Sequence, residues 1–233
     1  MNEQADINGK LYSQCDAYQE PLAFQLLHLA AAAYGNQYDE CITSFNSFWK
    51  EDSLMRRAWS SIQWVNKYFN NAHNSMWPDV LAFFSRVEFQ SYALTITGHS
   101  LGGALAALSA ARIVHDGYRS SQMLRLYTFG EPRVGSYEFA MYFDSLGIES
   151  YRVVFQEDVI PHQPGCHKDP TIPPNANGSR SRACLADASN PAYHHGIEIW
   201  YSESMILGQS NYRSQATANL DAQIQLLTGL QRR

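Results

Sequence analysis

Apolar residues recur every three or four positions along two stretches of the chain, and this spacing predicts helices. From Leu54 onward the apolar positions are Ala58, Ile62, Val65, Phe69, Ala72, Met76, Val80, Phe84 and Val87. We expect a long helix there, kinked or broken at Trp77-Pro78 because proline lacks a backbone donor. The apolar run from Leu22 to Ala33 predicts another helix, which Pro21 opens and Gly35 closes.

Short β-branched and apolar runs predict four strands, namely Tyr92–Thr97, Met123–Phe129, Tyr151–Phe155 and Ile197–Tyr201. A stretch rich in alanine and leucine, Leu101–His115, predicts a helix after the first strand. Ser136–Ser145 predicts another after the second, with Ser136 as its N-cap. Residues 156–192 show little periodicity and predict a long loop. The tail from Gly208 is polar, and spaced apolar residues between 220 and 230 indicate a short amphipathic helix.

The segment between the first strand and its helix carries the first sign of chemistry. It reads Thr97-Gly98-His99-Ser100-Leu101-Gly102-Gly103, which contains the G-x-S-x-G pattern of a nucleophile elbow. A strand that turns sharply into a helix holds the serine hydroxyl clear of the backbone, and the flanking glycines let the two elements close tightly. The same pattern also suits a glycine-bearing turn before a core helix. The catalytic interpretation therefore depends on the partners of Ser100.

A serine nucleophile needs a base, and the base needs a carboxylate that orients it. Asp158 follows the strand Tyr151–Phe155 and is expected at the same edge of the sheet as Ser100. His194 and His195 come directly before the last strand. Taken alone, each residue also suits a non-catalytic role. Asp158 could be a solvated acid on a loop, and either histidine could be a hydrogen-bonded imidazole. In the order serine, aspartate, histidine, they favour a catalytic triad.

Length, composition and charge are typical of one globular enzyme domain. The chain has 233 residues, with 45% hydrophobic and 17% charged residues. We expect a single domain over 1–233, with 1–20 and 208–233 peripheral or mobile. The net charge of −5 argues against a nucleic-acid partner and against steady attachment to anionic lipid. The apolar run Leu22–Ala33 is too short for a transmembrane segment.

The four cysteines are even in number, and two of them, Cys166 and Cys184, bracket a loop rich in proline, asparagine and glycine. That loop also holds the sequon Asn177-Gly178-Ser179. A disulfide between the two cysteines is expected in an oxidising compartment. The alternatives are free thiols, or a metal site with nearby histidines, which the spacing disfavours. The first twenty residues lack the apolar region of a signal peptide.

The chain resembles the class 3 lipase family, the fungal-lipase-like branch of the α/β-hydrolases, and looks most like its secreted animal members. The segments that carry the resemblance are Thr97–Ala106, Tyr127–Gly135, Arg152–Val154, Asp158–Pro161 and His194–Trp200. The resemblance implies an α/β-hydrolase fold with a mostly parallel central sheet. It also implies hydrolysis of lipid esters, typically acylglycerols, without a metal or organic cofactor. Secretion and transient contact with a lipid interface follow from the same resemblance; the oligomeric state does not.

The family pattern His-x-Gly-x-Glu falls on His194, Gly196 and Glu198, and it makes His194 the base. His195 is the alternative, because loop geometry decides which ring reaches Ser100. The first oxyanion donor is the backbone N–H of Leu101, the residue after the nucleophile.

One part of the family pattern is missing. Family members place the second oxyanion donor on a Gly-Thr-containing loop after an earlier strand, followed by a lid. The interval 36–99 holds no such pair, and the chemistry of Cys41–Trp49 is wrong for that loop. We therefore expect a sheet that is incomplete on its N-terminal side.

Two functions follow. The first is a lipase-type ester hydrolase with a Ser100–Asp158–His194 triad. The second is a catalytically impaired relative that binds lipid without efficient turnover.

Overall fold

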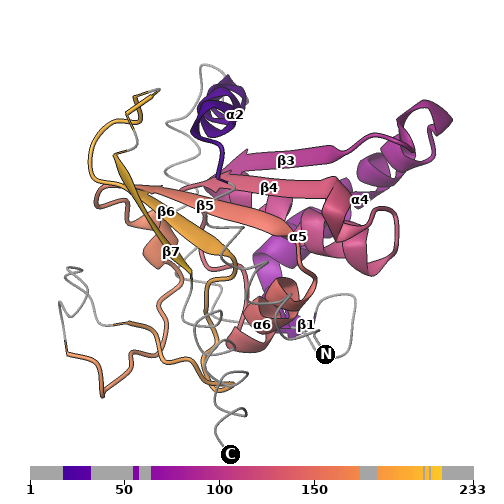
Figure 1. The fold of residues 1–233 in the computed structure, drawn as a ribbon. Coiled ribbons are helices and arrows are strands. Elements are labelled where there is room, and N and C mark those ends of the chain that lie inside the picture. The colour runs from indigo at the N-terminus through magenta and orange to yellow at the C-terminus, as the bar shows by residue number, and fades with distance from the viewer. Residues whose placement is uncertain are drawn as a thin grey trace, which may run out of the picture.

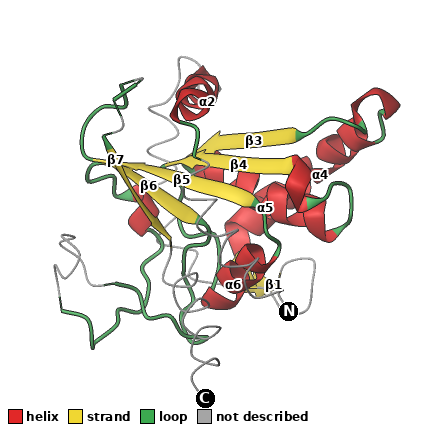
Figure 2. Cartoon of the chain, viewed as in Figure 1, coloured by secondary structure: helices red, strands yellow, loops and turns green. Residues whose placement is uncertain are grey.

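The computed structural model describes residues 18–32, 55–57, 64–173, 183–206, 208–209 and 211–216. A five-stranded sheet in the order β3-β4-β5-β6-β7 forms its centre (Figures 1 and 2). The strands are β3 (Leu94–His99), β4 (Leu124–Phe129), β5 (Glu149–Phe155), β6 (Ile197–Tyr201) and β7 (Tyr212–Ala216). The first four run parallel and β7 runs antiparallel to β6. The expectation of an α/β fold with a mostly parallel sheet is confirmed.

Helices cover both faces of this sheet, as parallel strands require (Figure 1). On one face lie α4 (Lys67–Phe84), α5 (Leu101–His115) and α6 (Tyr137–Ser145). Their core with the sheet includes fully buried side chains, among them Phe69, Leu108, Leu126 and Phe139. The other face carries α2 (Glu20–Ala32), which packs onto a second core of aromatic and aliphatic side chains, including Tyr127, Tyr151, Ile199 and Tyr201.

Most of the predicted elements appear where the sequence places them. The helix predicted over Leu101–His115 has those bounds, and the four predicted strands correspond to β3 to β6. The Ser136 hydroxyl accepts a hydrogen bond from the Phe139 N–H, so it caps α6 as expected. Short 3₁₀ helices lie at Val87–Phe89, Ser121–Met123 and Ile160–His162.

The long helix predicted from Leu54 is wrong in its first part. A small antiparallel hairpin, β1 (Met55–Arg57) with β2 (Trp64–Asn66), takes the place of its first turns. Helix α4 then begins at Lys67, where the Asn66 side chain accepts a hydrogen bond from the Tyr68 N–H. Pro78 does not break this helix, which continues to Phe84. The proline is on the exposed side of α4, where solvent can reach the carbonyl that loses its donor.

Two expectations concern the margins of the sheet. Strand β7 lies in the tail expected to be peripheral, and no alternation of apolar residues predicts it. At the other margin, β3 is the edge strand of the described sheet. The stretch Cys41–Trp49, considered for the oxyanion loop, lies outside the described residues, as do the predicted tail helix and the sequon.

Candidate active site

Ser100 occupies the sharp turn between β3 and α5. Its φ of +52° is a left-handed conformation that side-chain-bearing residues rarely adopt, and its N–H donates to the Phe129 carbonyl at 2.9 Å. Gly98 makes the turn possible, because a Cβ at that position would overlap the Gly102 carbonyl oxygen. The geometry is that of a nucleophile elbow, with the serine at the N-terminus of α5.

Helix α5 begins at Leu101, directly after the serine. The first N–H groups of a helix point out of its N-terminal end, nearly parallel to its axis, with no partner inside the helix, and they carry the positive end of its dipole. The N–H of Leu101, the predicted oxyanion donor, is the first of these groups. Because β3 is the edge of the described sheet, no neighbouring described strand supplies a second donor at this point.

Asp158 lies at the same edge of the sheet as Ser100. It follows the carboxyl end of β5, and its Oδ1 accepts a 2.9 Å hydrogen bond from the Ile160 N–H. Its Oδ2 lies against Gly130, where a Cβ would come within 2.6 Å of that oxygen and within 3.7 Å of His99 Nε2. Desolvation lowers the pKa of His99, and the Asp158 charge opposes that shift. Asp158 is thus next to the residue that precedes the serine.

His194 is in a different setting. It precedes the amino end of β6, whereas Ser100 and Asp158 follow the carboxyl ends of strands parallel to β6. Its Nε2 donates a 2.7 Å hydrogen bond to the Pro161 carbonyl oxygen. Burial, followed by the positive charges of Arg152 and Arg133, holds its pKa well below the ordinary value. Ser100 and Asp158 thus lie at one edge of the sheet. The hydrogen-bond partner of His194 Nε2 is the Pro161 carbonyl oxygen and neither of these two residues.

His195, the alternative base, belongs to the core. Its side chain is 1% exposed, its Nε2 donates to Glu131 Oε1 at 2.8 Å, and its ring centroid lies 3.8 Å from that of Phe143. Arg152 holds the same segment by donating from Nε to the His195 carbonyl at 2.6 Å. These contacts are those of a structural histidine.

Three residues near the elbow were not assigned roles from the sequence. Glu131 is buried, and its Cβ lies 3.3 Å from the position of a Cβ on Gly103, so it supports the first turn of α5. Gly130 lies against the Asp158 carboxylate, and His99 lies on the same side of Gly130. The signal for Glu131 was an acid directly after an apolar strand, within Phe129-Gly130-Glu131-Pro132. The contacts of Gly130 and His99 depend on the fold and left no such signal.

The described residues contain no group of three or more histidines, cysteines or acids that could hold a metal ion. Cys166 and Cys184 instead form the expected disulfide, with their Cα atoms 5.7 Å apart. Within the described part of the chain, no helix is long and apolar enough to cross a membrane.

Comparisons with known proteins point to one family. The model of the family described as lipase (class 3) matches residues 30–168. A lipase of Caenorhabditis elegans is 49% identical over 144 residues, which cover 62% of this chain and 41% of that protein. The chain thus spans less than half the length of that curated relative.

Solved structures show the same fold. Lipase II from Rhizopus niveus superposes with a TM-score of 0.53 and 26% identity, covering 74% of this chain and 57% of that one. A triacylglycerol lipase described as having a serine-protease triad at its catalytic centre superposes with a TM-score of 0.51 and 30% identity. That match covers 68% of this chain and 53% of the solved chain.

Proposed function

The chain belongs to the class 3 lipase family, and we propose from that membership that it is a carboxylic ester hydrolase of the triacylglycerol-lipase type. Ser100 is the nucleophile. The observation that carries the proposal is the left-handed backbone of Ser100 at the junction of β3 and α5. A strained conformation of this kind costs about 1–3 kcal/mol and persists where the surrounding fold enforces it, often at functional sites.

In the proposed reaction, Ser100 Oγ attacks the ester carbonyl carbon while its proton passes to a histidine. The negative charge that develops on the carbonyl oxygen faces the Leu101 N–H and the positive end of α5. The histidine then returns the proton to the departing alcohol, which leaves an acyl-serine. Water, deprotonated by the same histidine, hydrolyses the acyl-serine and restores the hydroxyl. Asp158 is proposed to orient the histidine and to stabilise its charged form.

We assign the base to His194 on the family pattern. A ring nitrogen that donates to the Pro161 carbonyl carries its proton and has no lone pair to offer. His194 must therefore leave Pro161 before Nε2 can accept the Ser100 proton. A pKa held well below the ordinary value also makes the ring a weaker base.

The hydrogen bond between His194 and Pro161 favours the second candidate function, a relative that binds lipid without efficient turnover. The position of β3 at the edge of the described sheet favours it too, because a single preorganised donor stabilises an oxyanion less than two do. One such donor contributes on the order of 10²–10³ in turnover. Between the two candidates, we propose weak hydrolysis of small activated esters.

Secretion is part of the proposal. The Cys166–Cys184 disulfide supports it, because disulfides persist in oxidising compartments and are rare in the cytosol. The substrate is a lipid or other ester that meets the enzyme transiently at a lipid surface, and the reaction needs no cofactor.

Two assays on the full chain test the proposal. A fluorophosphonate probe should label the wild-type protein at Ser100 and should not label Ser100→Ala. The wild type should hydrolyse p-nitrophenyl butyrate, and Ser100→Ala should lose that activity. Equal hydrolysis by Ser100→Ala would remove the serine from the mechanism.

The base and the substrate class need their own comparison. His194→Gln should lower butyrate hydrolysis by about a hundredfold or more, as loss of a general base does. Unchanged hydrolysis in His194→Gln would reject His194 as the base. Emulsified triglyceride should be turned over far more slowly than p-nitrophenyl butyrate. Turnover equal to that of an intact fungal lipase would contradict the proposed weak activity.

A further inference from the structure

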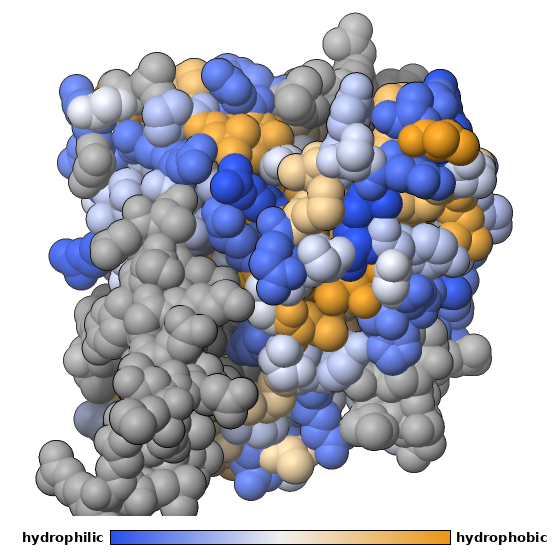
Figure 3. All heavy atoms as spheres, turned by 45° about the vertical axis from the view of Figure 1, so that its right-hand side comes forward, coloured by the Kyte–Doolittle hydropathy of each residue, from blue (hydrophilic) through white to orange (hydrophobic). Residues whose placement is uncertain are grey.

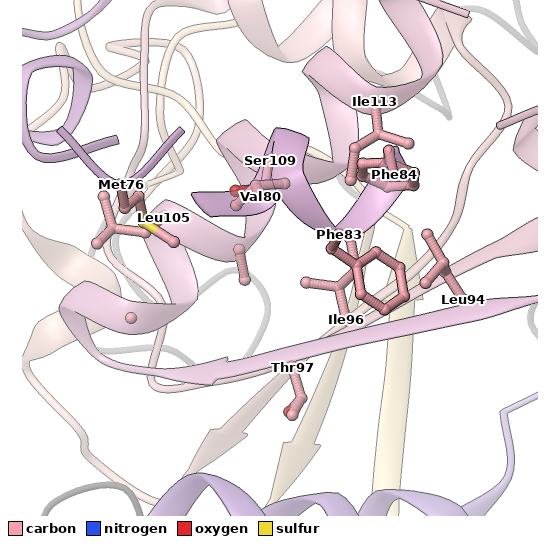
Figure 4. A pocket seen from close by; sticks show the side chains of 12 residues that line it. Met76, Val80, Phe83, Phe84, Leu94, Ile96, Thr97, Leu105, Ser109 and Ile113 are labelled. Atoms are coloured by element: carbon pink, nitrogen blue, oxygen red, sulfur yellow. The ribbon is translucent and has the colours of Figure 1, made fainter. Parts of the chain in front are cut away.

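The hollow between α4, α5 and β3 is not lined by the proposed triad. It measures about 350 Å³, and its lining contains no charged residue and none of Ser100, Asp158 and His194 (Figure 4). The view that brings this side of the molecule forward shows apolar patches between hydrophilic ones (Figure 3). The contacts of Asp158 and His194 lie instead on the loops after β4 and β5, where the fold buries charge.

Arg133, on the loop between β4 and α6, is a charged residue that is only 4% exposed. Its Nη1 donates to the His162 carbonyl oxygen at 2.5 Å and to the Pro164 carbonyl oxygen at 2.9 Å. Its backbone N–H donates to the carbonyl oxygen of the residue between them, Gln163, at 2.7 Å. One arginine thus binds three consecutive carbonyl groups.

These carbonyl groups end the turn that begins at Asp158. The Ile160 N–H donates to Asp158 Oδ1, and two backbone hydrogen bonds close the rest of the turn. Inside the turn, the Pro161 carbonyl oxygen accepts the 2.7 Å hydrogen bond from His194 Nε2. The position of this turn therefore sets the positions of both the Asp158 carboxylate and the His194 ring.

The chemistry of the acceptors explains why an arginine is suited to this place. A guanidinium carries five donors and no acceptor, so it satisfies several carbonyl oxygens at once. An apolar side chain would leave the His162 and Pro164 carbonyl groups without this donor. Desolvation, followed by the charge of Arg152, lowers the pKa of Arg133 to about 10, so the group still carries its charge at neutral pH.

Arg152 of β5 holds the segment of His194 from another side. Its Nε donates to the His195 carbonyl oxygen at 2.6 Å, and its Nη1 lies 3.6 Å from Glu198 Oε2. After burial, the charges of Arg152 and Arg133 are the largest causes that lower the pKa of His194. Both guanidinium groups therefore lie close enough to the imidazole to act on it, and His194 is held between the Pro161 carbonyl and the segment that Arg152 binds.

We propose that Arg133 is a positioning residue of the active site, which fixes the turn after Asp158 and seats the His194 ring on Pro161. The inference rests on the proposed ester hydrolysis and names a residue that acts through both partners of Ser100. His194 leaves this seat to reach Ser100, so a fixed seat also sets where that movement starts. A displacement of about 1 Å in a reacting group can cost about a hundredfold in turnover. Loss of the Arg133 side chain should therefore appear in kcat.

The first experiment measures kcat and KM for p-nitrophenyl butyrate on folded protein. Arg133→Met should lower kcat at least about tenfold and leave KM within about twofold. Arg133→Lys should recover part of the loss, because both side-chain bonds come from one nitrogen and an ammonium group carries three donors. Arg125→Met, which removes an arginine that is 45% exposed and paired with Glu149, should behave as the wild type.

An Arg133 that only stabilises the fold would lower the free energy of unfolding in Arg133→Met and leave kcat as it is. A kcat of Arg133→Met equal to that of the wild type, or above it, would therefore overturn the inference. Arg133→Gln, which stays polar, is the substitute if Arg133→Met does not fold.

The second experiment observes the imidazole nitrogens by NMR in protein labelled with ¹⁵N-histidine, with His194→Gln and His195→Gln as assignment variants. In the wild type both rings should be neutral and protonated at Nε2, as their bonds to Pro161 and Glu131 require. In Arg133→Met the His194 signals should shift or broaden as the ring loses its seat. The His195 signals should not change, since Glu131 still holds that ring.

The two experiments separate the two proposals. If the wild type hydrolyses no ester while the His194 signals respond to Arg133→Met, the proposed function fails and the seating of His194 by Arg133 stands. If esters are hydrolysed and the His194 signals are the same in the wild type and in Arg133→Met, the inference fails alone, whatever the kinetics.

Discussion

His195 donates a 2.8 Å hydrogen bond from Nε2 to Glu131 Oε1, and both side chains are buried. Glu131 in turn packs against Gly103 in the first turn of α5. The pair joins the segment before β6 to the segment after β4, two parts of the chain that are 64 residues apart. Through Glu131 the pair contacts the first turn of α5, the helix that begins at Leu101.

The first prediction concerns this pair. His195→Ala removes the donor and leaves the Glu131 carboxylate buried without it, so the free energy of unfolding should fall by about 3–5 kcal/mol. Urea denaturation measures the loss. Glu131→Gln keeps an acceptor for His195 at the same place and should cost less. A loss below about 1 kcal/mol in His195→Ala would show that the pair contributes little to the fold.

The second prediction concerns Gly130 and rests on the proposed role of Asp158. In Gly130→Ala the new methyl group would press on Asp158 Oδ2, at 2.6 Å, and displace the carboxylate. Ester hydrolysis should fall by about a hundredfold.

Gly117→Ala is the matched control, because Gly117 also has a positive φ, +78°, but a Cβ there meets no atom within 4 Å. Both variants should lose a similar amount of stability from backbone strain. Equal activity in the two variants would mean that the position of Asp158 does not matter for hydrolysis.

The third prediction concerns pH and His73, a fully buried residue of α4. Burial, and then the Arg112 charge, lower the pKa of His73 to about 4. The unfolded chain, with an ordinary histidine pKa near 6.5, then binds the proton more readily than the folded chain. Keeping His73 neutral and buried therefore costs the folded state nothing above pH 6.5. As the pH falls from 6.5 toward 4, the free energy of unfolding decreases by about 3 kcal/mol on account of this residue.

Urea denaturation at pH 7, 5.5 and 4.5 tests this expectation. His73→Gln should flatten the fall in stability relative to the wild type over that range. His28→Gln, which replaces an exposed histidine of α2, should leave the pH dependence as it is in the wild type. If the free energies of unfolding of the wild type and His73→Gln fell in parallel as the pH is lowered, His73 would be excluded as the source of the pH dependence.

The fourth prediction concerns the disulfide. The Cys166–Cys184 bridge closes a loop with a sequence separation of 18, and cross-links of that size stabilise by about 3 kcal/mol. Dithiothreitol should lower the free energy of unfolding of the wild type by about that amount. The Cys166→Ala/Cys184→Ala double variant should be equally unstable with and without the reductant. Non-reducing peptide mapping that finds both thiols free would refute the bridge in solution.

Local sequence was sufficient for the elements whose signals are local. Helix α5 was predicted at its bounds because the glycine turn marks its start and alanine and leucine fill its interior. The hairpin of β1 and β2 was missed because Ala58, Ile62 and Val65 happen to follow helical spacing. Strand β7 was missed because Tyr212-Arg213-Ser214-Gln215-Ala216 lacks apolar alternation and is held by pairing with β6.

In the candidate site, too, some positions follow from local sequence and strand order, whereas others depend on tertiary packing. Asp158 could be placed beside Ser100 because the carboxyl ends of parallel strands meet at one edge of a sheet. The partner of His194 could not be predicted, since its bond to Pro161 joins two loops whose paths depend on tertiary packing. For the same reason spacing does not separate His194 from His195, whose rings have different hydrogen-bond partners in the structure, Pro161 and Glu131.

The contact between Gly98 and Gly102 has a consequence for reading related sequences. Any side chain at position 98 would collide with helix backbone, so the folded state forbids replacement there whether or not the neighbouring serine reacts. A related protein that no longer hydrolyses esters would still need that glycine in order to fold. The presence of this glycine in a related sequence is therefore evidence for the fold alone. Evidence of a working catalyst has to come from residue 100 and its proton acceptor.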